Sequence, residues 1–585
     1  KVRSTFEARG YTAWDPTSPV FLLGDEYGRK TLYIPTVFYS YTGEALDRKT
    51  PLMRSVEAVS AQALRILRLL GNTTATGVQA MVGSEQEYFL VDRRLYVQRP
   101  DLMMCGRTLY GAKPAKGQEM EDHYFGSIPS RVLAYMQDVE QRLFALGIPA
   151  HTRHNEVAPG QFEIAPVYED VNIATDHNML TMEVMRRTAR RHGYVCLLHE
   201  KPFAGVNGSG KHNNWSLCDS DGHNLLNPGE TPMKNAQFLV FLAAVLRAVH
   251  KHGINLRLGI IGASNDHRLG ANEAPPAVVS MFLGTELTEI LDAIESDTAY
   301  DAKEKELLKI GVHVLPKFPK DTTDRNRTSP FAFTGNKFEF RMLGSAASIS
   351  DANVVLNTAV AESLRQYADK LEGAEDFETA LHDLIRDTIR AHKRIIFNGN
   401  GYDESWVAEA EKRGLLNFKS AADAFPHYVD QKNLDLFAKH NVYTSAEIYS
   451  RMETQLEEYN KILHIEAMTM SDMVREEITP ACIAFENELA GTVNAKKAAG
   501  VTGGMEAGLL GKVSELTEEL YTKSAALDEA IAAVPTDDNE KAAHYYHDVV
   551  ISAMDEVRAP ADKLEGLVGK KFWPFPTYSD ILFYV

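Results

Sequence analysis

The chain has 585 residues, 44% of them hydrophobic, which is enough apolar material to bury a large core over roughly three or four domains and excludes a mostly disordered protein. Its 80 acidic residues outnumber the 62 basic ones, and the formal net charge of -18 disfavours a nucleic-acid partner because no segregated basic patch is visible. The longest apolar run, residues 238–246, is far shorter than the roughly 20 residues of a membrane-spanning helix, so we expect no membrane partner.

The first part of the chain is typical of a small sheet domain. Short β-rich runs lie between residues 18 and 40, and a helical pattern follows over residues 55–70. We therefore predict an N-terminal sheet domain over residues 1–75.

Residues 76–350 alternate between strand-like and helical segments. The strand-like segments cover residues 81–91, 161–166 and 337–342, and the helical ones cover residues 130–146, 176–192 and 235–252. This alternation predicts an α+β or α/β body, which we expect to carry the catalytic core.

The rest of the chain, residues 351–585, is predicted to be a helical C-terminal region. Residues 445–478 place Glu, Met and Leu at helical spacing, and we expect Pro480 to end this helix. A Gly-rich stretch at residues 500–511 predicts a flexible tip between two long helices.

The second of these helices is expected to resume near Lys512. It should pause at residues 535–538, whose Pro-Thr-Asp-Asp sequence predicts an N-cap, and continue from Asn539 towards Val557.

Four cysteines are too few and too scattered for a disulfide framework, and none forms a CxxC pair. A reducing compartment, the cytoplasm, fits this usage best. The chain begins at Lys1 rather than Met, which leaves open whether it is trimmed or has lost a targeting segment.

The first chemical signal is a pair of carboxylates, Glu85 and Glu87, inside an apolar and aromatic run. On one continuous strand both side chains would point to the same face. Two like charges against an apolar background repel each other unless a cation compensates them. The alternative is an ordinary solvated strand face.

The second signal places Glu156 and Glu163 on either side of a Pro159-Gly160 turn. Such a turn can fold the two carboxylates back towards one point, although a loop with two ordinary acids is the alternative. Together with the first pair, this makes four carboxylates, and oxygen-rich clusters suit hard cations such as Mg²⁺ or Mn²⁺.

The third signal is a glycine-rich loop at residues 201–216. Its glycines allow close approach of a ligand, and Lys201, Ser209 and Lys211 are candidate donors to phosphate or carboxylate. The spacing is not that of a Walker A loop. A lone His in a loop is usually structural, but His212 follows these glycines and is a candidate metal ligand in combination with the carboxylates.

These motifs, in this order, resemble the glutamine synthetase family over nearly the whole chain. The type III branch is indicated by the forms that the family motifs take at residues 208–215 and 324–331, by the helical C-terminal region, and by the C-terminal sequence at residues 572–578. The resemblance implies an α+β fold, in which a β-grasp-like N-terminal domain precedes a catalytic domain built on an antiparallel sheet with helices.

The resemblance also implies two or three Mg²⁺ or Mn²⁺ ions and matches their ligands residue by residue. One ion would be held by Glu87, Glu156 and Glu163, and the other by Glu85, His212 and Glu339. All six positions are occupied by the expected residue types.

Further site residues follow from the same resemblance. The glutamate-binding set is Asn207, Gly208, His212, Arg268 and Arg341. The ATP-binding set is Tyr168, Ser216, Arg327 and Lys337. In catalysis, Glu273 would be the base on a mobile flap, Arg327 would stabilise the transferring phosphoryl group, and Arg341 would help phosphate to leave. The expected ammonium-site Asp is not recognisable, and Asp47 is the candidate.

The implied activity is glutamate–ammonia ligation, which serves glutamine biosynthesis and nitrogen assimilation. ATP is the co-substrate and γ-glutamyl phosphate the intermediate. The family places its active sites between subunits, so the resemblance implies a homo-oligomer, with a dodecamer of two stacked hexameric rings expected.

Two alternatives remain open from the sequence. One is a related ligase that joins glutamate to an amine larger than ammonia, which the metal and ATP motifs do not distinguish. The other is a non-catalytic structural or binding descendant of the fold, against which the intact set of six ligands argues.

Overall fold

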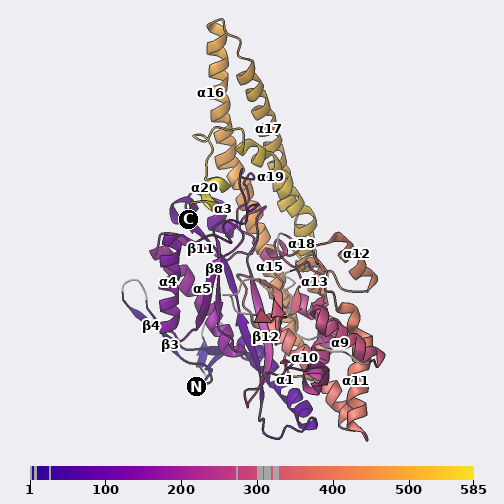
Figure 1. Cartoon of the computed structure of the whole chain (residues 1–585). Coiled ribbons are helices and arrows are strands. Elements are labelled where there is room, and N and C mark those ends of the chain that lie inside the picture. The colour runs from indigo at the N-terminus through magenta and orange to yellow at the C-terminus, as the bar shows by residue number, and fades with distance from the viewer. Residues whose placement is uncertain are drawn as a thin grey trace.

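Figure 1 shows the computed structural model, a body of sheets and helices from which a long helical hairpin projects. The structure describes residues 3–5, 10–24, 28–271, 274–298, 307–308, 318–319 and 328–584. Within these ranges, no helix combines the length and the hydropathy that a bilayer span needs.

The N-terminal part is built from short antiparallel strands. A three-stranded sheet has the order β1 (Arg3–Thr5), β2 (Gly10–Trp14), β5 (Thr36–Ser40), and β3 (Phe21–Gly24) pairs with β4 (Lys30–Tyr33) as a hairpin. Helix α1 (Lys49–Leu69) begins six residues earlier than predicted, because Pro51 in its first turn is compatible with a helix start.

The body contains two further sheets. The six-stranded sheet has the order β10 (Glu169–Asp170), β6 (Val78–Ser84), β12 (Gly210–Asp219), β17 (Phe338–Gly344), β16 (Phe331–Phe333), β13 (Met281–Phe282). The four-stranded sheet has the order β11 (Tyr194–Leu197), β7 (Gln86–Asp92), β9 (Gln161–Pro166), β8 (Ala150–Asn155). All pairs are antiparallel except β13 with β16.

The single strand predicted over residues 81–91 is wrong. The chain leaves one sheet at Ser84 and enters the other at Gln86, so that Glu85 lies at the junction. There its backbone N–H donates to the His212 carbonyl at 3.1 Å. The two halves of the apolar run therefore belong to different sheets, and the acidic residue between them lies where the sheets meet.

The predicted helices of the body are confirmed, and they cover the two sheets. Helix α6 (Ala236–Lys251) packs with α1 and α10 (Ser350–Leu371) in the core of the six-stranded sheet. Helices α4 (Ser130–Ala145) and α5 (Val171–Arg191) pack on the four-stranded sheet. Helix α5 begins earlier than predicted, because the Asp170 side chain caps it by accepting the Asn172 N–H.

Further α-helices and strands lie in the described chain. They are α2 (Arg93–Tyr96), α3 (Pro100–Cys105), α7 (Gly253–Leu258), α8 (Ala263–Asp266), α9 (Gly284–Ser296), α11 (Phe377–His392), α12 (Glu404–Lys412), α13 (Ala421–Ala424), α14 (Gln431–Lys439), α20 (Tyr578–Leu582), β14 (Leu307–Leu308) and β15 (Phe318–Pro319).

The prediction that Pro480 ends a helix is wrong. Helix α15 (Ser445–Met473) continues through a π-helical turn, residues 474–478, directly into α16 (Thr479–Ala498). Proline has no N–H and its ring clashes with the carbonyl four residues back, and a local π-helical turn is one way to accommodate both effects without ending the helix. The result is one long helical path that reaches from the body into the projecting hairpin (Figure 1).

Helix α17 (Gly504–Ala532) forms the second arm of this hairpin (Figure 1). It begins before Lys512, so Gly508 and Gly511 belong to the helix and the connection at the tip is shorter than predicted. Glycine only weakens a helix, and packing of the α16 and α17 faces outweighs that cost here.

The predicted N-cap after α17 is confirmed. Asp538 accepts the N–H groups of Glu540 and Lys541 at the start of α18 (Asn539–Tyr545), and α19 (Ile551–Glu565) follows after a second π-helical turn.

Candidate active site

An acidic cavity of about 150 Å³ lies where the two sheets of the body meet. Its lining residues come from the β6–β7 junction, β7, β8, the β8–β9 turn, β9, β12, β17 and three loops. They are Glu85, Glu87, Tyr124, His154, Glu156, Gln161, Glu163, Asn207, Gly208, His212, Arg268, Ala274, Glu339 and Arg341. All six predicted metal ligands are therefore in one place.

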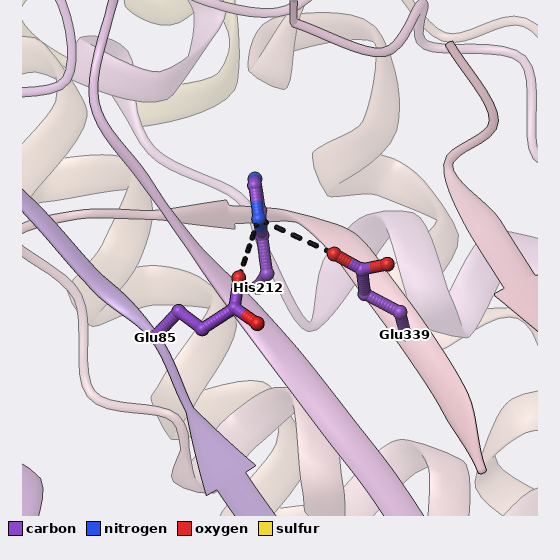
Figure 2. Close-up of side chains that lie close together, drawn as sticks. All are labelled: Glu85, His212 and Glu339. Carbon is purple, nitrogen blue, oxygen red and sulfur yellow. Dashed lines mark hydrogen bonds and ion pairs between the residues drawn. The ribbon is translucent and has the colours of Figure 1, made fainter. Parts of the chain in front are cut away.

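Two of these ligands, Glu85 and Glu339, lie beside the imidazole of a third, His212 (Figure 2). His212 Nδ1 lies 2.8 Å from a Glu85 oxygen and 3.3 Å from a Glu339 oxygen. Register explains the meeting: β12 pairs with β6 on one side and with β17 on the other, and Asn214 lies opposite Glu339. The ligand atoms of the trio lie within 4.8 Å of one another.

The other carboxylates extend this group into the four-stranded sheet. Glu87 and Glu163 lie opposite each other in the β7–β9 register, and both are grouped with His212. Glu156 joins through Glu163, and His154 Nε2 lies 2.8 Å from a Glu156 oxygen and 3.6 Å from a Glu163 oxygen.

The electrostatics of the cavity are those of crowded, buried like charges. Burial and the neighbouring carboxylates Glu85 and Glu156 raise the pKa of Glu163 well above its usual value. Burial and the charge of Glu156 also raise the pKa of Glu87. Glu85 behaves differently because, although burial opposes ionisation, the hydrogen bond and charge of His212 lower its pKa to about 2.

Opposing effects act on the pKa of His212. Burial, supported by the Arg341 charge, disfavours its protonated form, whereas Glu87 and Glu85 favour it and raise its pKa. An oxygen-rich set with one imidazole, buried and carrying several negative charges, can hold divalent cations, which would remove the repulsion.

The absence of Cβ atoms in the glycine-rich loop leaves room for the Arg268 side chain. A Cβ on Gly210 would lie 2.2 Å from the Arg268 guanidinium, and a Cβ on Gly208 would lie 2.4 Å from the Glu200 carbonyl. Arg268 is buried and donates to the carbonyls of Leu343 and Arg341 at 3.3 and 3.2 Å, while its Nε has no hydrogen-bond partner among the described residues. Asn207 and Gly208 line the cavity beside it.

The predicted donor role of Lys211 is wrong, whereas those of Lys201 and Ser209 stay predictions. Successive residues of β12 point to opposite faces, so that Lys211 lies behind the sheet when His212 faces the cavity. The Lys211 ammonium donates to the carbonyls of Ser345 and Ala347, and burial lowers its pKa to about 7. The Lys201 ammonium donates to the Val206 carbonyl, and the Ser209 hydroxyl accepts from Gln161 at 3.1 Å.

Strand β17 carries Glu339 and Arg341 on one face, as period two predicts. Arg341 donates to Glu339 at 2.9 Å and lines the cavity. Lys337 immediately precedes the strand, and Ser216 shares the His212 face of β12.

Tyr168 is 67% exposed and lies against Gly83, so its ring is accessible rather than packed in the core.

Two predicted catalytic residues, Glu273 and Arg327, lie outside the described residues. Asp47 lines a different cavity from the acidic one in this chain, between α1 and α15, and one of its oxygens accepts the Thr50 N–H at 2.9 Å. Its assignment to an ammonium site stays a prediction.

His154 and Tyr124 are cavity residues that the sequence did not reveal. His154 could have been noticed, because it lies two residues before Glu156, at the end of β8. Tyr124 lies in the connection between α3 and α4, whose sequence carries no recognisable signal for a site.

Similarity to known proteins is extensive. The family model for the N-terminal domain of type III glutamine synthetase matches residues 1–55, that for the glutamine synthetase catalytic domain matches residues 65–253, and that for the glutamine synthetase C-terminal domain matches residues 380–497. The type-3 glutamine synthetase of Dictyostelium discoideum is 46% identical over 596 aligned positions, covering 100% of this chain and 80% of that protein.

Two bacterial relatives are similar over comparable lengths. The glutamine synthetase of Butyrivibrio fibrisolvens is 47% identical, covering 94% of this chain and 79% of its own, and that of Bacteroides fragilis is 43% identical, covering 100% and 81%. A solved Plasmodium falciparum glutamine synthetase aligns with a TM-score of 0.48 and 15% identity over 77% of this chain and 84% of its own.

Proposed function

This chain belongs to the type III branch of the glutamine synthetase family, whose reaction is the ATP-dependent amidation of glutamate with ammonia, and we propose that this reaction takes place in the acidic cavity. The observation that carries the proposal is the convergence of five glutamates and His212 at the meeting of two sheets. A related ligase for larger amines and a non-catalytic descendant are not favoured, because relatives that match nearly the whole chain are glutamine synthetases.

The residues fit a pair of divalent cations. Glu85, His212 and Glu339 would hold one ion, and Glu87, Glu156 and Glu163 the other, with His154 beside the second group. The fit rests on the buried carboxylates, whose mutual repulsion is only partly offset by His212, Arg268 and Arg341 in the protein alone. Bound Mg²⁺ or Mn²⁺ would supply charge neutralisation at the phosphate and carboxylate oxygens.

The cationic side chains of the cavity suit an anionic substrate. Arg268 is positioned to pair with a glutamate carboxylate, and Asn207 and Gly208 offer an amide and an open backbone beside it. The paired Arg341 can transfer its hydrogen bond from Glu339 to a phosphate oxygen when phosphate leaves. Because a free carboxylate is a poor electrophile, its activation as γ-glutamyl phosphate precedes attack by ammonia.

ATP would lie on the rim of the cavity near β12 and β17. Ser216 and Lys337 are the proposed nucleotide contacts, and the exposed ring of Tyr168 is the proposed stacking surface. Arg327, for the transferring phosphoryl group, and Glu273, as the base that also shields the intermediate from water, are proposed on the family resemblance.

We also propose an oligomeric state, roles for the three regions of the chain and a cellular compartment. We expect a homo-oligomer, a dodecamer of two stacked hexameric rings, because the family completes each site with a neighbouring subunit. The sheet domain over residues 1–75 would supply that contribution, residues 76–350 the catalytic core and residues 351–585 the helical region around it. Four free cysteines suit a cytoplasmic enzyme.

One coupled assay tests the function. Glutamate, ATP, Mg²⁺ and ammonium are combined, and each is omitted in turn while glutamine and ADP are measured. Glutamine should form only in the complete mixture. Equal turnover with ethanolamine or a polyamine in place of ammonium would support a ligase for larger amines. No ADP formation in the complete mixture would refute the proposal that the protein is an enzyme.

A further inference from the structure

A segment of the connection between α3 and α4, residues 117–127, contributes Tyr124 to the lining of the acidic cavity. The buried Asn155 side chain donates to the carbonyls of His123, Gly126 and Ser127 at 3.0, 3.3 and 3.4 Å. His123 Nδ1 lies 2.6 Å from the Glu156 carbonyl, and because a carbonyl can only accept, Nδ1 carries the proton. The far end of the segment is thus tied to the strand end and turn that carry the proposed metal ligands.

The near end of the segment is tied to the glycine-rich loop through a single side chain, Gln118. The Asn207 backbone N–H donates to Gln118 Oε1 at 2.8 Å, and Gln118 Nε2 donates to Asn207 Oδ1 at 2.8 Å. The backbone N–H can only donate, so the Gln118 atom facing it must be the oxygen. The other end of the Gln118 amide must then be NH₂, and the Asn207 atom facing it must be its oxygen.

This chain of hydrogen bonds fixes the orientation of the Asn207 amide. With its oxygen accepting from Gln118, Asn207 presents its NH₂ group elsewhere, and Asn207 lines the acidic cavity. A donor is what a substrate carboxylate requires, and it is valuable in a cavity lined by five carboxylates, which are acceptors when ionised.

We propose that Gln118 is a positioning residue for glutamate binding, which orients the Asn207 amide so that its NH₂ group faces the substrate carboxylate. The inference rests on the proposed function, since it assumes that glutamate binds beside Asn207 and Arg268. Gln118 acts only through Asn207 and takes no part in ATP binding or in the chemistry.

The discriminating variant is Gln118→Glu, which keeps the shape and the acceptor but removes the donor. Its carboxylate still accepts the Asn207 N–H but repels the Asn207 oxygen, so the Asn207 amide should turn over and present oxygen to the substrate. Met120→Glu is the matched control, because it adds the same charge two residues away on a side chain that is 73% exposed. Gln118→Leu removes both hydrogen bonds without adding charge.

We expect Gln118→Glu to raise the KM for glutamate roughly 10- to 100-fold, the range for one hydrogen bond to a charged group, with the KM for ATP unchanged. Gln118→Leu should raise it less, because the Asn207 amide is then free to adopt either orientation, and Met120→Glu should have little effect. In an Asn207→Ala background, Gln118→Glu should add nothing further, because the residue through which it acts is absent.

The results separate the inference from the function. Wild-type protein that makes no glutamine would refute the proposed function. With an active wild type, a glutamate KM for Gln118→Glu no higher than that for Met120→Glu would overturn the inference and leave the function standing. The inference would also be overturned if Gln118→Glu raised the glutamate KM as much in the Asn207→Ala background as in the wild type, or if it raised the KM for ATP in parallel.

Discussion

The crowding of carboxylates in the acidic cavity predicts an unusual mutational response at Glu163. Glu163 is only 6% exposed and lies opposite Glu87 across the β7–β9 pair. In the absence of divalent cations, Glu163→Gln should stabilise the protein, because it removes one buried negative charge and keeps the side-chain shape. In the presence of Mg²⁺ or Mn²⁺, the same change should lose the stabilisation that cation binding confers.

The two effects are of similar size and opposite sign. Side chains directly opposite on antiparallel strands are about 5 Å apart, and two full charges at that distance repel by about 3 kcal/mol at an effective dielectric constant of about 20. Protonation relieves part of this repulsion, because the pKa of both carboxyl groups is raised, so we expect a gain of about 1–3 kcal/mol. A cation at 100 times its Kd stabilises the wild type by about 2.7 kcal/mol, which the variant would largely lose.

Thermal unfolding followed by circular dichroism, at one protein concentration, tests this with EDTA and with saturating Mn²⁺. The Glu163→Gln protein should melt above the wild type in EDTA and gain far less from Mn²⁺ than the wild type does, so that its advantage disappears in Mn²⁺. The exposed Glu411→Gln is the control for loss of a charge away from the cavity and should follow the wild type in both. A Glu163→Gln protein that melts lower in EDTA and keeps the full wild-type response to Mn²⁺ would refute the reasoning.

The remaining predictions concern the same cavity. Glu339→Ala or His212→Ala should abolish Mg²⁺-dependent glutamine formation with an unchanged far-UV spectrum, and near-wild-type activity in either would contradict the metal assignment. Burial raises the pKa of Glu87 and Glu163, so the cation-free protein should lose stability as the pH rises from about 4.5 through those raised values. The stabilisation by Mn²⁺ should grow over the same pH range. A stabilisation by Mn²⁺ that does not change with pH would count against this prediction. Gly210→Ala should raise the KM for glutamate at least 10-fold, because its Cβ would lie 2.2 Å from the Arg268 guanidinium, whereas Gly491→Ala, which meets nothing within 4 Å, should not.

Short stretches of sequence predicted most of the residues that line the acidic cavity. Hard cations and anionic ligands were predicted from three short motifs: the pair Glu85 and Glu87, the turn between Glu156 and Glu163, and the glycine-rich loop. The helical and strand periods located α4, α6 and β9 to within a residue or so.

Long-range pairing decided the rest. Glu85 lies at a break between two sheets because β6 and β7 have different partners, and no local pattern encodes those partners. The path from α15 through α16 and back along α17 is likewise held by side chains of separate helices that pack into one core.

What the sequence determined by itself was therefore the identity of the reactive groups, because the type and spacing of side chains in a few residues suffice to indicate their chemistry. The tertiary structure alone decided which of them meet. Lys211 and His212 are neighbours in sequence but lie on opposite faces of β12, whereas Gln118 and Asn207 are 89 residues apart and share two hydrogen bonds. The physical reason is that side-chain direction follows from local backbone geometry, but proximity follows from which strands and loops pack together across the whole chain.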